Sequence, residues 1–413
     1  MVDTLSEREQ SILVQIRDTA PPAQARRAAI ILLSYAGQDA ATIAAATQVT
    51  RHTVWRWRRE WRKARLGIFP DQRAGADLPA PVREPIPGVD IPRLPLALLP
   101  AVGVLPDDPV AEAGRKVLRF HFERMLLNEP GSRLGIDIEA VHDMRVATRR
   151  MRSAFRLFKP FFVAKAVQPF RDALREIAAA LGAVRDLEVA LDKAGRFAAE
   201  HPGSDLTPLL DLWDAQLSEA RTALIAMLDS KRFARFVRRF DEFLREPGAG
   251  ARPAPAAHAP VPYQVRHVAP RLIYTHYEQV RAYEPVLAGA PVATLHALRI
   301  EFKRLRYALE FFEEVLGPEA KRVIKEIKRM QDHLGDLNDA DVAITQLHAI
   351  IDAHEATYSG TPAFARPDLG GVYDYAAALA AERQALIESF PEAWAAFLSD
   401  DIRRDLALAV AAL

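Results

Sequence analysis

The chain has 413 residues, half of them hydrophobic, and its 55 Lys and Arg nearly balance its 54 Asp and Glu, leaving a formal net charge of +1. This length predicts roughly two to three domains, and the balanced charge excludes capture of a polyanion by total charge, so a polyanion needs a local concentration of basic side chains. The absence of cysteine excludes disulfides and thiolate metal sites, and because no apolar run approaches the roughly 18 residues of a membrane span, we expect a cytoplasmic protein with no membrane partner.

The first predicted unit, residues 1–66, is a small helical domain. Its segment 39–67 indicates two helices joined by a tight turn, with Thr50 as the N-cap of the second helix. The residues at the spacing of a helix-turn-helix core are Ile43, Ala44, Val49, Val54 and Trp57. The side chains expected to project towards DNA bases are Arg51, His52, Thr53 and Arg56, and those expected to reach phosphates are Arg58, Arg59, Arg62, Lys63 and Arg65.

This unit resembles the helix-turn-helix domain of insertion-sequence transposases and related regulators. It departs from their pattern at Gln48, where the turn usually has a glycine that tolerates positive φ, and at Thr47, where an apolar residue is common. No Asp-Asp-Glu transposase core follows, so transposition is not implied. Duplex DNA binding by residues 1–66 is one expectation, and the alternative is a three-helix adaptor for self-association or partner contacts, with exposed faces of Trp55 and Trp61.

Proline-rich segments divide the rest of the chain. Residues 67–106 contain nine prolines and no sustained helical period, which predicts an extended linker. We expect this linker to let the N-terminal unit move semi-independently of the remainder, because it offers no packed surface of its own. A second Pro/Ala segment, 247–262, separates two further units at 107–246 and 263–413.

These two units carry a repeat. The segment VHDMRVATRRMRSAFRLF at 141–158 returns as LHALRIEFKRLRYALEFF at 295–312, at a constant offset of 154 residues. At about 100° per residue, each copy predicts a helix with one apolar stripe for a core and a neighbouring stripe of basic side chains. Matching helices precede and follow the repeat, and no alternating strand pattern appears. The fold class we predict is all-α: two four-helix bundles related by a pseudo-two-fold axis, with the basic helices facing each other across a central groove.

The basic stripes predict a site for a linear polyanion. Arginine suits phosphate because its planar fork donates two parallel hydrogen bonds and keeps its charge near neutral pH. The candidate site residues of the first unit are His142, Arg145, Arg149, Arg150, Arg152, Arg175 and Lys116. Those of the second unit are His296, Arg299, Lys303, Arg304, Arg306, Lys328 and Arg271. For the two histidines there are two alternatives: they donate hydrogen bonds to phosphate, or they have a core or capping role.

The pattern H-x-x-R-x-x-x-[RK]-R-x-R occurs twice in this duplicated helical context, together with LGAVRD and LGDLND, and in these features the chain resembles the CHAD family. The resemblance covers about 107–413. It implies a pair of helical bundles whose basic cleft binds inorganic polyphosphate, in proteins that associate with polyphosphate granules. The family's basic residues map onto the motif positions from His142 to Arg152 and from His296 to Arg306.

The second copy of the motif departs from the first. Lys303 replaces an arginine, and Glu310 stands where the first copy has Arg156. These differences predict weaker anion binding at the end of the groove that the second copy forms. Many members of the family also carry a triphosphate-tunnel domain marked by an E-x-E-x-K strand. The chain shows no such strand, so that enzymatic activity is not implied.

An enzymatic alternative rests on Asp332, Asp336 and Asp339, which share one helix face and would hold Mg²⁺ in a polyphosphate hydrolase. We favour charge pairing with neighbouring Arg and Lys, because only Asp339 has an acidic counterpart in the first unit. A non-enzymatic protein without metal or cofactor is therefore expected. The remaining alternative is a transcriptional regulator whose helical unit binds nucleic acid or a phosphorylated effector.

The duplicated Gly182 and Gly335, each costing about 1 kcal/mol inside a helix, predict close helix approach.

Overall fold

The computed structural model of the chain describes residues 5–19, 22–49, 53–55, 57–58, 61, 65–68, 99–134, 138–253, 255, 261–362 and 366–413. Over these residues the regular elements are helices and no strand is present, which confirms the predicted all-α class. None of the helices in this part of the chain combines the length and the apolar character needed to cross a membrane.

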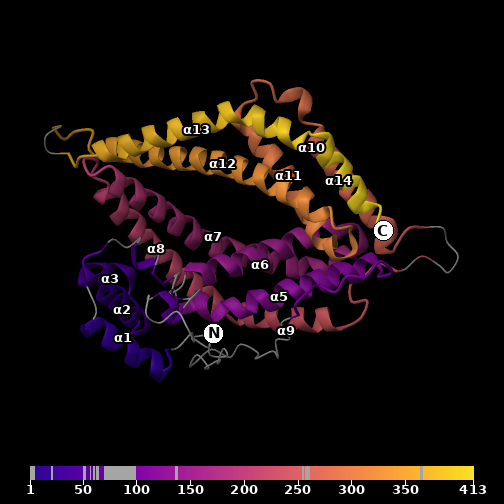
Figure 1. The fold of residues 1–413 in the computed structure, drawn as a ribbon, viewed down its shortest axis with the longest axis horizontal. Coiled ribbons are helices and arrows are strands. Elements are labelled where there is room, and N and C mark those ends of the chain that lie inside the picture. Colours follow the sequence, from indigo (N-terminus) through magenta and orange to yellow (C-terminus); the bar gives the residue numbers. More distant parts are fainter. Residues whose placement is uncertain are drawn as a thin grey trace.

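The large unit repeats one order of helices (Figure 1). The first half consists of α5 (Val110–Leu134), α6 (Ile138–Leu157), α7 (Ala164–Glu200), α8 (Thr207–Leu228) and α9 (Lys231–Arg245). The second half consists of α10 (Val265–Arg281), α11 (Val292–Phe312), α12 (Ala320–Thr357), α13 (Gly370–Phe397) and α14 (Asp400–Val410). Each half thus has four principal helices and a shorter terminal one, and the basic repeat occupies α6 and α11.

Equivalent residues of the two halves meet where α6 and α11 end. Phe158 and Phe312, which are related by the offset of 154, lie edge to face with ring centroids 5.8 Å apart. Phe158 also stacks on Phe311 at 6.2 Å. Residues that contact their own counterparts lie next to a two-fold axis, so the pseudo-two-fold axis passes through this aromatic contact. The rings are buried in one continuous core that includes residues of both halves.

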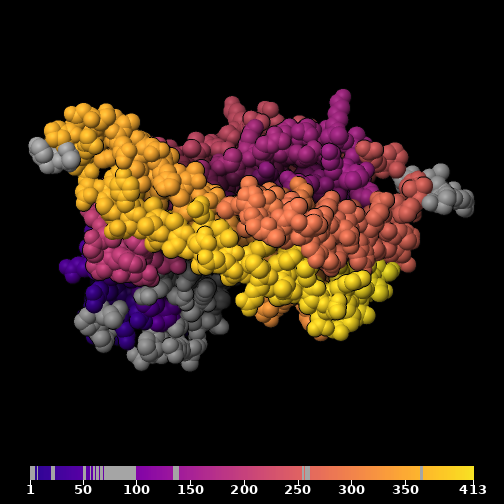
Figure 2. Space-filling model, turned by 90° about the horizontal axis from the view of Figure 1, so that it is seen from above, coloured from indigo at the N-terminus to yellow at the C-terminus, as the bar shows by residue number. Residues whose placement is uncertain are grey.

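A second contact joins the halves at the opposite end of the long helices α7 and α12. There the Ser204 hydroxyl, in the turn after α7, donates to Asp374 Oδ2 of α13 at 2.7 Å. Glycine is required at position 371, because a Cβ on Gly371 would lie 2.3 Å from the carbonyl oxygen of Asp205. Figure 2 shows the resulting arrangement, in which the second half, orange to yellow, lies along the first half, purple to magenta.

The N-terminal unit packs three helices around a small core of its own: α1 (Glu7–Thr19), α2 (Pro22–Tyr35) and α3 (Ala40–Thr47). The core predicted for the helix-turn-helix is confirmed. Its buried members are Ile43, Ala44 and Val54, and the partly buried residues packed against them include Val49 and Trp57.

The turn after α3 forms despite its unusual sequence. Gln48 has φ 55° and ψ 46°, the left-handed conformation that glycine usually supplies, at a cost of roughly 1–2 kcal/mol. Thr47 is buried, and its hydroxyl donates to the carbonyl of Ile43 at 2.6 Å. Both departures from the usual pattern are therefore compatible with the helix-turn-helix geometry.

Two of the arginines assigned to phosphate contacts are structural instead. Arg58 is buried and donates to the Ser34 hydroxyl at 2.7 Å and to the Gln38 carbonyl at 2.9 Å. Arg65 is buried in an ion pair with Glu9 at 2.6 Å. For these two residues the prediction is wrong, because helical spacing does not show which basic side chains turn inwards. The other three of that group lie outside the described residues: Arg59, Arg62 and Lys63.

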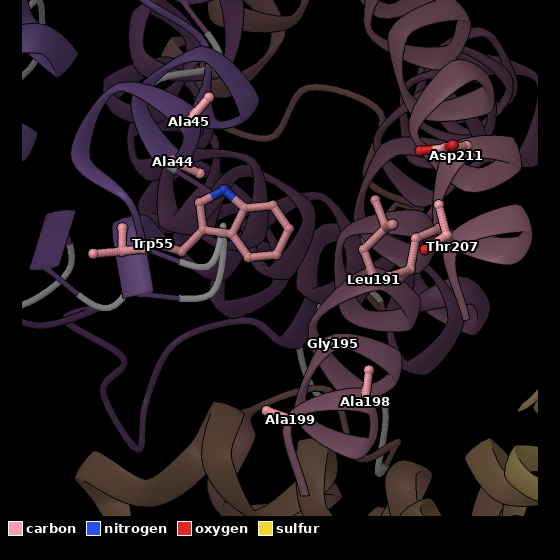
Figure 3. Close-up of a pocket in the computed structure, with 11 residues that line it drawn as sticks. Ala44, Ala45, Trp55, Leu191, Gly195, Ala198, Ala199, Thr207 and Asp211 are labelled. Atoms are coloured by element: carbon pink, nitrogen blue, oxygen red, sulfur yellow. The ribbon is translucent and has the colours of Figure 1, made fainter. Parts of the chain in front are cut away.

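The tryptophans expected to present exposed faces are buried. Trp61 is 1% exposed, and its indole N–H donates to the Tyr35 hydroxyl at 3.2 Å. Trp55 is 7% exposed and belongs to the core of the large unit, where it points towards α7 and α8 (Figure 3). The N-terminal unit is therefore packed on the large unit, contrary to the expectation of semi-independent units.

The end of the proline-rich segment is packed as well. The Glu314 carboxylate accepts the backbone N–H groups of Val102, Gly103 and Val104 at 2.6, 2.7 and 2.9 Å. Gly103 has φ 78°, which an L-residue adopts only with strain. Residues 69–98 of the predicted linker lie outside the described part of the chain.

Candidate anion-binding site

The basic stripes of α6 and α11 meet between the two halves. Lys303 of α11 interacts electrostatically with four guanidinium groups, two from each helix: Arg145, Arg149, Arg299 and Arg306. Burial, followed by repulsion from these groups, lowers the pKa of Lys303 to about 8. These five residues are referred to below as the basic cluster. The two copies of the repeated motif are thus juxtaposed.

Much of the positive charge of the basic cluster is not neutralised. Arg145 pairs with Asp186, the counterpart of Asp339 in the first half, at 3.1 Å. Within the described part of the chain, Arg149, Arg299 and Lys303 have no ion pair, and Nε of Arg149 is buried without a hydrogen-bond partner. An unpaired buried donor costs about 1–3 kcal/mol, more when it is charged. A bound anion would remove this cost and relieve the repulsion among the cations.

A glycine of each long helix lies beside a guanidinium of the basic cluster. A Cβ on Gly182 of α7 would lie 4.0 Å from Nε of Arg145, and a Cβ on Gly335 of α12 would lie 3.8 Å from Nε of Arg299. The prediction that these glycines mark close helix approach is wrong, because the neighbour beyond their own helix is an arginine side chain in each case. The absent side chains leave room for the guanidinium groups to lie along α7 and α12.

The two motif histidines have different neighbours. His142 is half-buried, and burial together with the adjacent Arg185 lowers its pKa, which favours the neutral ring near pH 7. His296 is exposed, and its Nδ1–H donates to Oδ1 of Asn338. Arg185 and Asn338 are equivalent at the offset of 153, so residues at one repeated position interact with the motif histidine of each half. Sequence reasoning missed Arg185, although the duplicated LGAVRD and LGDLND segments contain this signal.

Glu310 is a buried carboxylate, 6% exposed, between the two halves. Three cations predicted for the site surround it: Arg150 at 3.0 Å, Arg306 at 3.6 Å and Lys328 at 3.8 Å. Arg150 and Arg306 also lie 6.0 and 5.1 Å from the ring centre of Tyr307. Because Arg150 belongs to α6, Glu310 neutralises charge at this crossing and ties the halves together.

A cavity of about 350 Å³ adjoins the basic cluster on the side of α10. The basic side chains that line it are Arg156, Lys159, His276, Lys303 and Arg304. Tyr307 also lines the cavity, and its buried hydroxyl has no hydrogen-bond partner among the described residues. Arg304 is balanced by Glu301 in an ion pair. The cavity is therefore cationic and has a free hydroxyl donor in its wall.

Two residues of this cavity were not predicted from the sequence. Lys159 follows the repeated motif and belongs to the short turn after α6. His276 has a counterpart in His121 at the offset of 155, so the duplication contained a signal. His121 is buried, which lowers its pKa to about 3, whereas His276 faces the cavity. The repeated histidine has thus taken different environments in the two halves.

Arg152 and Arg175 form a separate group in the first half. Arg152 is exposed near Arg156 and Arg175, and its pKa is lowered by partial burial and by these two guanidinium groups. Arg175 pairs with Asp172 at 3.0 Å. The structure therefore places Arg175 next to Arg152 on the basic stripe of α6, outside the basic cluster.

Lys116 and Arg271, which match each other in the repeat, are the predicted residues that the structure does not connect to the basic cluster. Nζ of Lys116 lies 2.7 Å from Asp108 Oδ2 and 2.8 Å from the Gly103 carbonyl, where it holds the segment before α5. Arg271 is exposed on α10 and has no ion pair within the described residues.

The aspartates of the hydrolase alternative do not assemble into a metal centre. Among the described residues, no three His, Cys, Asp or Glu side chains are grouped as metal ligands. Asp336 is partly buried, and burial together with Asp339 and Asp332 raises its pKa, against the opposing effect of Lys193 from α7. The hydrolase alternative therefore has no group of three metal ligands to support it among these residues. The charge pairing that we favoured is not observed either, since none of the three aspartates has an ion pair within the described part of the chain.

Of the side chains predicted to contact DNA bases, Thr53 is half-buried. The other three lie outside the described residues: Arg51, His52 and Arg56.

The fold and the basic cluster define a duplicated helical protein with a cationic site at the junction of its halves. Residues 116–348, more than half of the chain, match the CHAD domain, and the protein belongs to the CHAD domain family. Residues 21–67 match a homeodomain-like domain. Both resemblances predicted from the sequence are confirmed.

Similar proteins agree with this assignment. The uncharacterized proteins MT2285 and Rv2226 of Mycobacterium tuberculosis are each 29% identical over 277 residues, which is 63% of this chain and 50% of theirs. The chain thus spans about half the length of the curated relatives it matches. The crystal structure of the CHAD domain from the plant Ricinus communis is 25% identical, with a TM-score of 0.50 over 74% of this chain and 95% of its own. PptA from Streptomyces chartreusis shares the fold at 18% identity, with a TM-score of 0.51 over 70% and 99% of the two chains.

Proposed function

We propose that this protein binds inorganic polyphosphate at the basic cluster. The observation that carries the proposal is the meeting of Arg149, Arg299 and Lys303, from equivalent helices, without ion-pair partners among the described residues. The resemblance to polyphosphate-binding CHAD proteins agrees with this chemistry.

The symmetry of the site favours a repeating ligand. Because α6 and α11 are equivalent about the pseudo-two-fold axis, they present similar rows of cations in related orientations. A linear polymer of phosphate offers the same oxygen atoms along its whole length, so both rows bind it in the same way. Arginine forks and a lysine are the donors that suit such oxygens.

Charge reversal in the basic cluster tests the proposal. We expect Arg145→Glu with Arg149→Glu, or Arg299→Glu with Lys303→Glu, to weaken binding of long-chain polyphosphate by roughly 100-fold or more. The affinity of the unmodified protein should fall steeply with salt concentration, as for other polyanion complexes. Fluorescence anisotropy with labelled polyphosphate, with triphosphate and duplex DNA as competitors at matched salt, measures both effects.

Helix α9 provides a matched control. Arg238 and Arg239 are exposed on α9, which lies on the side of the first half away from α11 (Figure 1). Arg238→Glu with Arg239→Glu makes the same change in net charge and should leave the affinity within about twofold. A folded quadruple variant of the basic cluster that still binds normally would refute the proposed site.

We further propose that the protein acts as a binder and not as a hydrolase, and that binding places it at polyphosphate granules. Phosphate release from polyphosphate with Mg²⁺ or Mn²⁺ tests the first point, and no turnover is expected. Release that stops in Asp332→Asn with Asp336→Asn would establish the hydrolase instead. A fluorescent fusion should colocalise with granules in cells, and the charge-reversed quadruple variant should not.

DNA binding by the N-terminal unit is the second function we propose. It is favoured by the homeodomain-like match at 21–67 and by the left-handed turn at Gln48. The full chain should bind duplex DNA with strong salt dependence, and Arg51→Ala with Arg56→Ala should weaken it. Absence of DNA binding, together with self-association that needs residues 1–66, would favour the adaptor alternative.

A further inference from the structure

A cavity of about 480 Å³ lies between the N-terminal unit and the large unit (Figure 3). One wall comes from α3 and Trp55, and the other comes from α7 and α8. Small-molecule sites in proteins commonly have volumes of about 300–1,000 Å³ and often lie between domains. No residue of the basic cluster lines this cavity, so it is separate from the proposed polyphosphate site.

The wall formed by α7 is built from very small residues. Gly195 faces the cavity, and a Cβ on it would meet no atom within 4 Å. A glycine inside a helix costs about 0.5–1 kcal/mol relative to alanine. Gly182 on the same helix leaves room for a guanidinium group, but among the residues that the structure describes no atom occupies the space beside Gly195. Ala198 and Ala199 continue this wall, so the described residues leave this space open.

Trp55 supplies an apolar surface and an unused donor. Its indole ring projects from the N-terminal unit into the space in front of Leu191 (Figure 3). The side chain is 7% exposed, and among the described residues its N–H has no hydrogen-bond acceptor. An acceptor atom on a bound molecule would give this N–H a partner.

The opposite side of the cavity has polar groups at the start of α8. Thr207 and Asp211 are exposed residues in its lining, and their oxygen atoms face the same space in Figure 3. A carboxylate at this position favours a donor or a positive charge and disfavours an anion. We propose that the cavity binds a small neutral or cationic molecule with an apolar, preferably aromatic, body and a hydrogen-bond acceptor for the indole N–H of Trp55.

Binding of the neutral fluorophore Prodan to the full chain tests this proposal. Prodan has a naphthalene body and a carbonyl acceptor, and its emission shifts to the blue in apolar sites. We expect saturable binding at one site per chain, with energy transfer from tryptophan. Trp55→Phe retains a ring but removes the N–H, and should weaken binding roughly two- to tenfold.

Variants that fill the cavity provide a stricter test of binding. Gly195→Leu with Ala198→Leu should weaken Prodan binding more than tenfold, while the fold survives because leucine is a better helix former than glycine. Ala223→Leu, at an exposed position of α8 outside the cavity, is the matched control and should bind normally. Polyphosphate should neither displace Prodan nor lose affinity for the filled variant. Absence of saturable binding, unchanged binding by the filled variant, or displacement by polyphosphate would each overturn the proposal.

Discussion

Lys303 and its counterpart Arg149 carry the same charge, but only the lysine titrates near neutral pH. The pKa of Lys303 is lowered to about 8, whereas a guanidinium group stays protonated. A polyphosphate ligand favours the ammonium form, so the complex holds a proton that the free protein loses above pH 8. We expect the affinity to fall about tenfold between pH 7 and pH 9. Titrations at constant ionic strength measure this slope.

Lys303→Arg is the control for this prediction, because it keeps the charge at every pH used and should flatten the profile. An unchanged slope in that variant would assign the titration to another group.

Lys303 should also make the stability of the protein depend on pH. Unfolded lysine titrates near 10.5, so between about pH 8 and 10.5 the unfolded state binds more protons, and stability should rise with pH in this window. Lys303→Met should remove that rise.

At the scale of elements, α6 and α11 are joined by opposite charges as well as by aromatic rings. Glu310→Gln would leave Arg150, Arg306 and Lys328 without their shared carboxylate. Breaking a buried pair costs up to about 3–5 kcal/mol, and because these cations are partly exposed we expect about 2 kcal/mol. The added positive charge should also strengthen polyphosphate binding several-fold. Urea unfolding and anisotropy measure the two effects.

A surface ion pair on α12 supplies the comparison for Glu310. Glu326 and Arg329 lie 2.8 Å apart, and the arginine is largely exposed. Glu326→Gln should therefore change stability by less than about 1 kcal/mol. Equal destabilisation by the two substitutions would show that Glu310 does not have a special role between the halves.

At the scale of the whole molecule, Trp55 determines how the N-terminal unit sits on the rest of the protein. Trp55→Ala removes a buried aromatic side chain, a change that costs about 3–5 kcal/mol in a core. We expect the loss to appear as release of the N-terminal unit, so that the radius of gyration measured by small-angle X-ray scattering increases. Polyphosphate affinity should stay within about twofold, because the basic cluster lies elsewhere. An unchanged radius of gyration would show that the contact with α7 and α8 does not hold the units together.

The helical class, the duplication and the basic character of α6 and α11 were predictable from the sequence. Helical periodicity places side chains on faces through local geometry alone, and the constant offset between 141–158 and 295–312 identifies equivalent positions without coordinates. The small core of the helix-turn-helix was predictable for the same reason.

Only the tertiary structure decided which charges are neutralised and which surfaces are covered. Glu310 and Arg150 are 160 residues apart in the sequence, but their side chains lie 3.0 Å apart in space. The periodicity of a single helix cannot predict such a contact. The inward positions of Arg58 and Arg65, the contact of Trp55 with the large unit and the lowered pKa of Lys303 depend on segments that are distant in sequence. Electrostatic and packing energies depend on these separations and on burial, so a pattern within one helix shows the available groups, and the fold determines their partners.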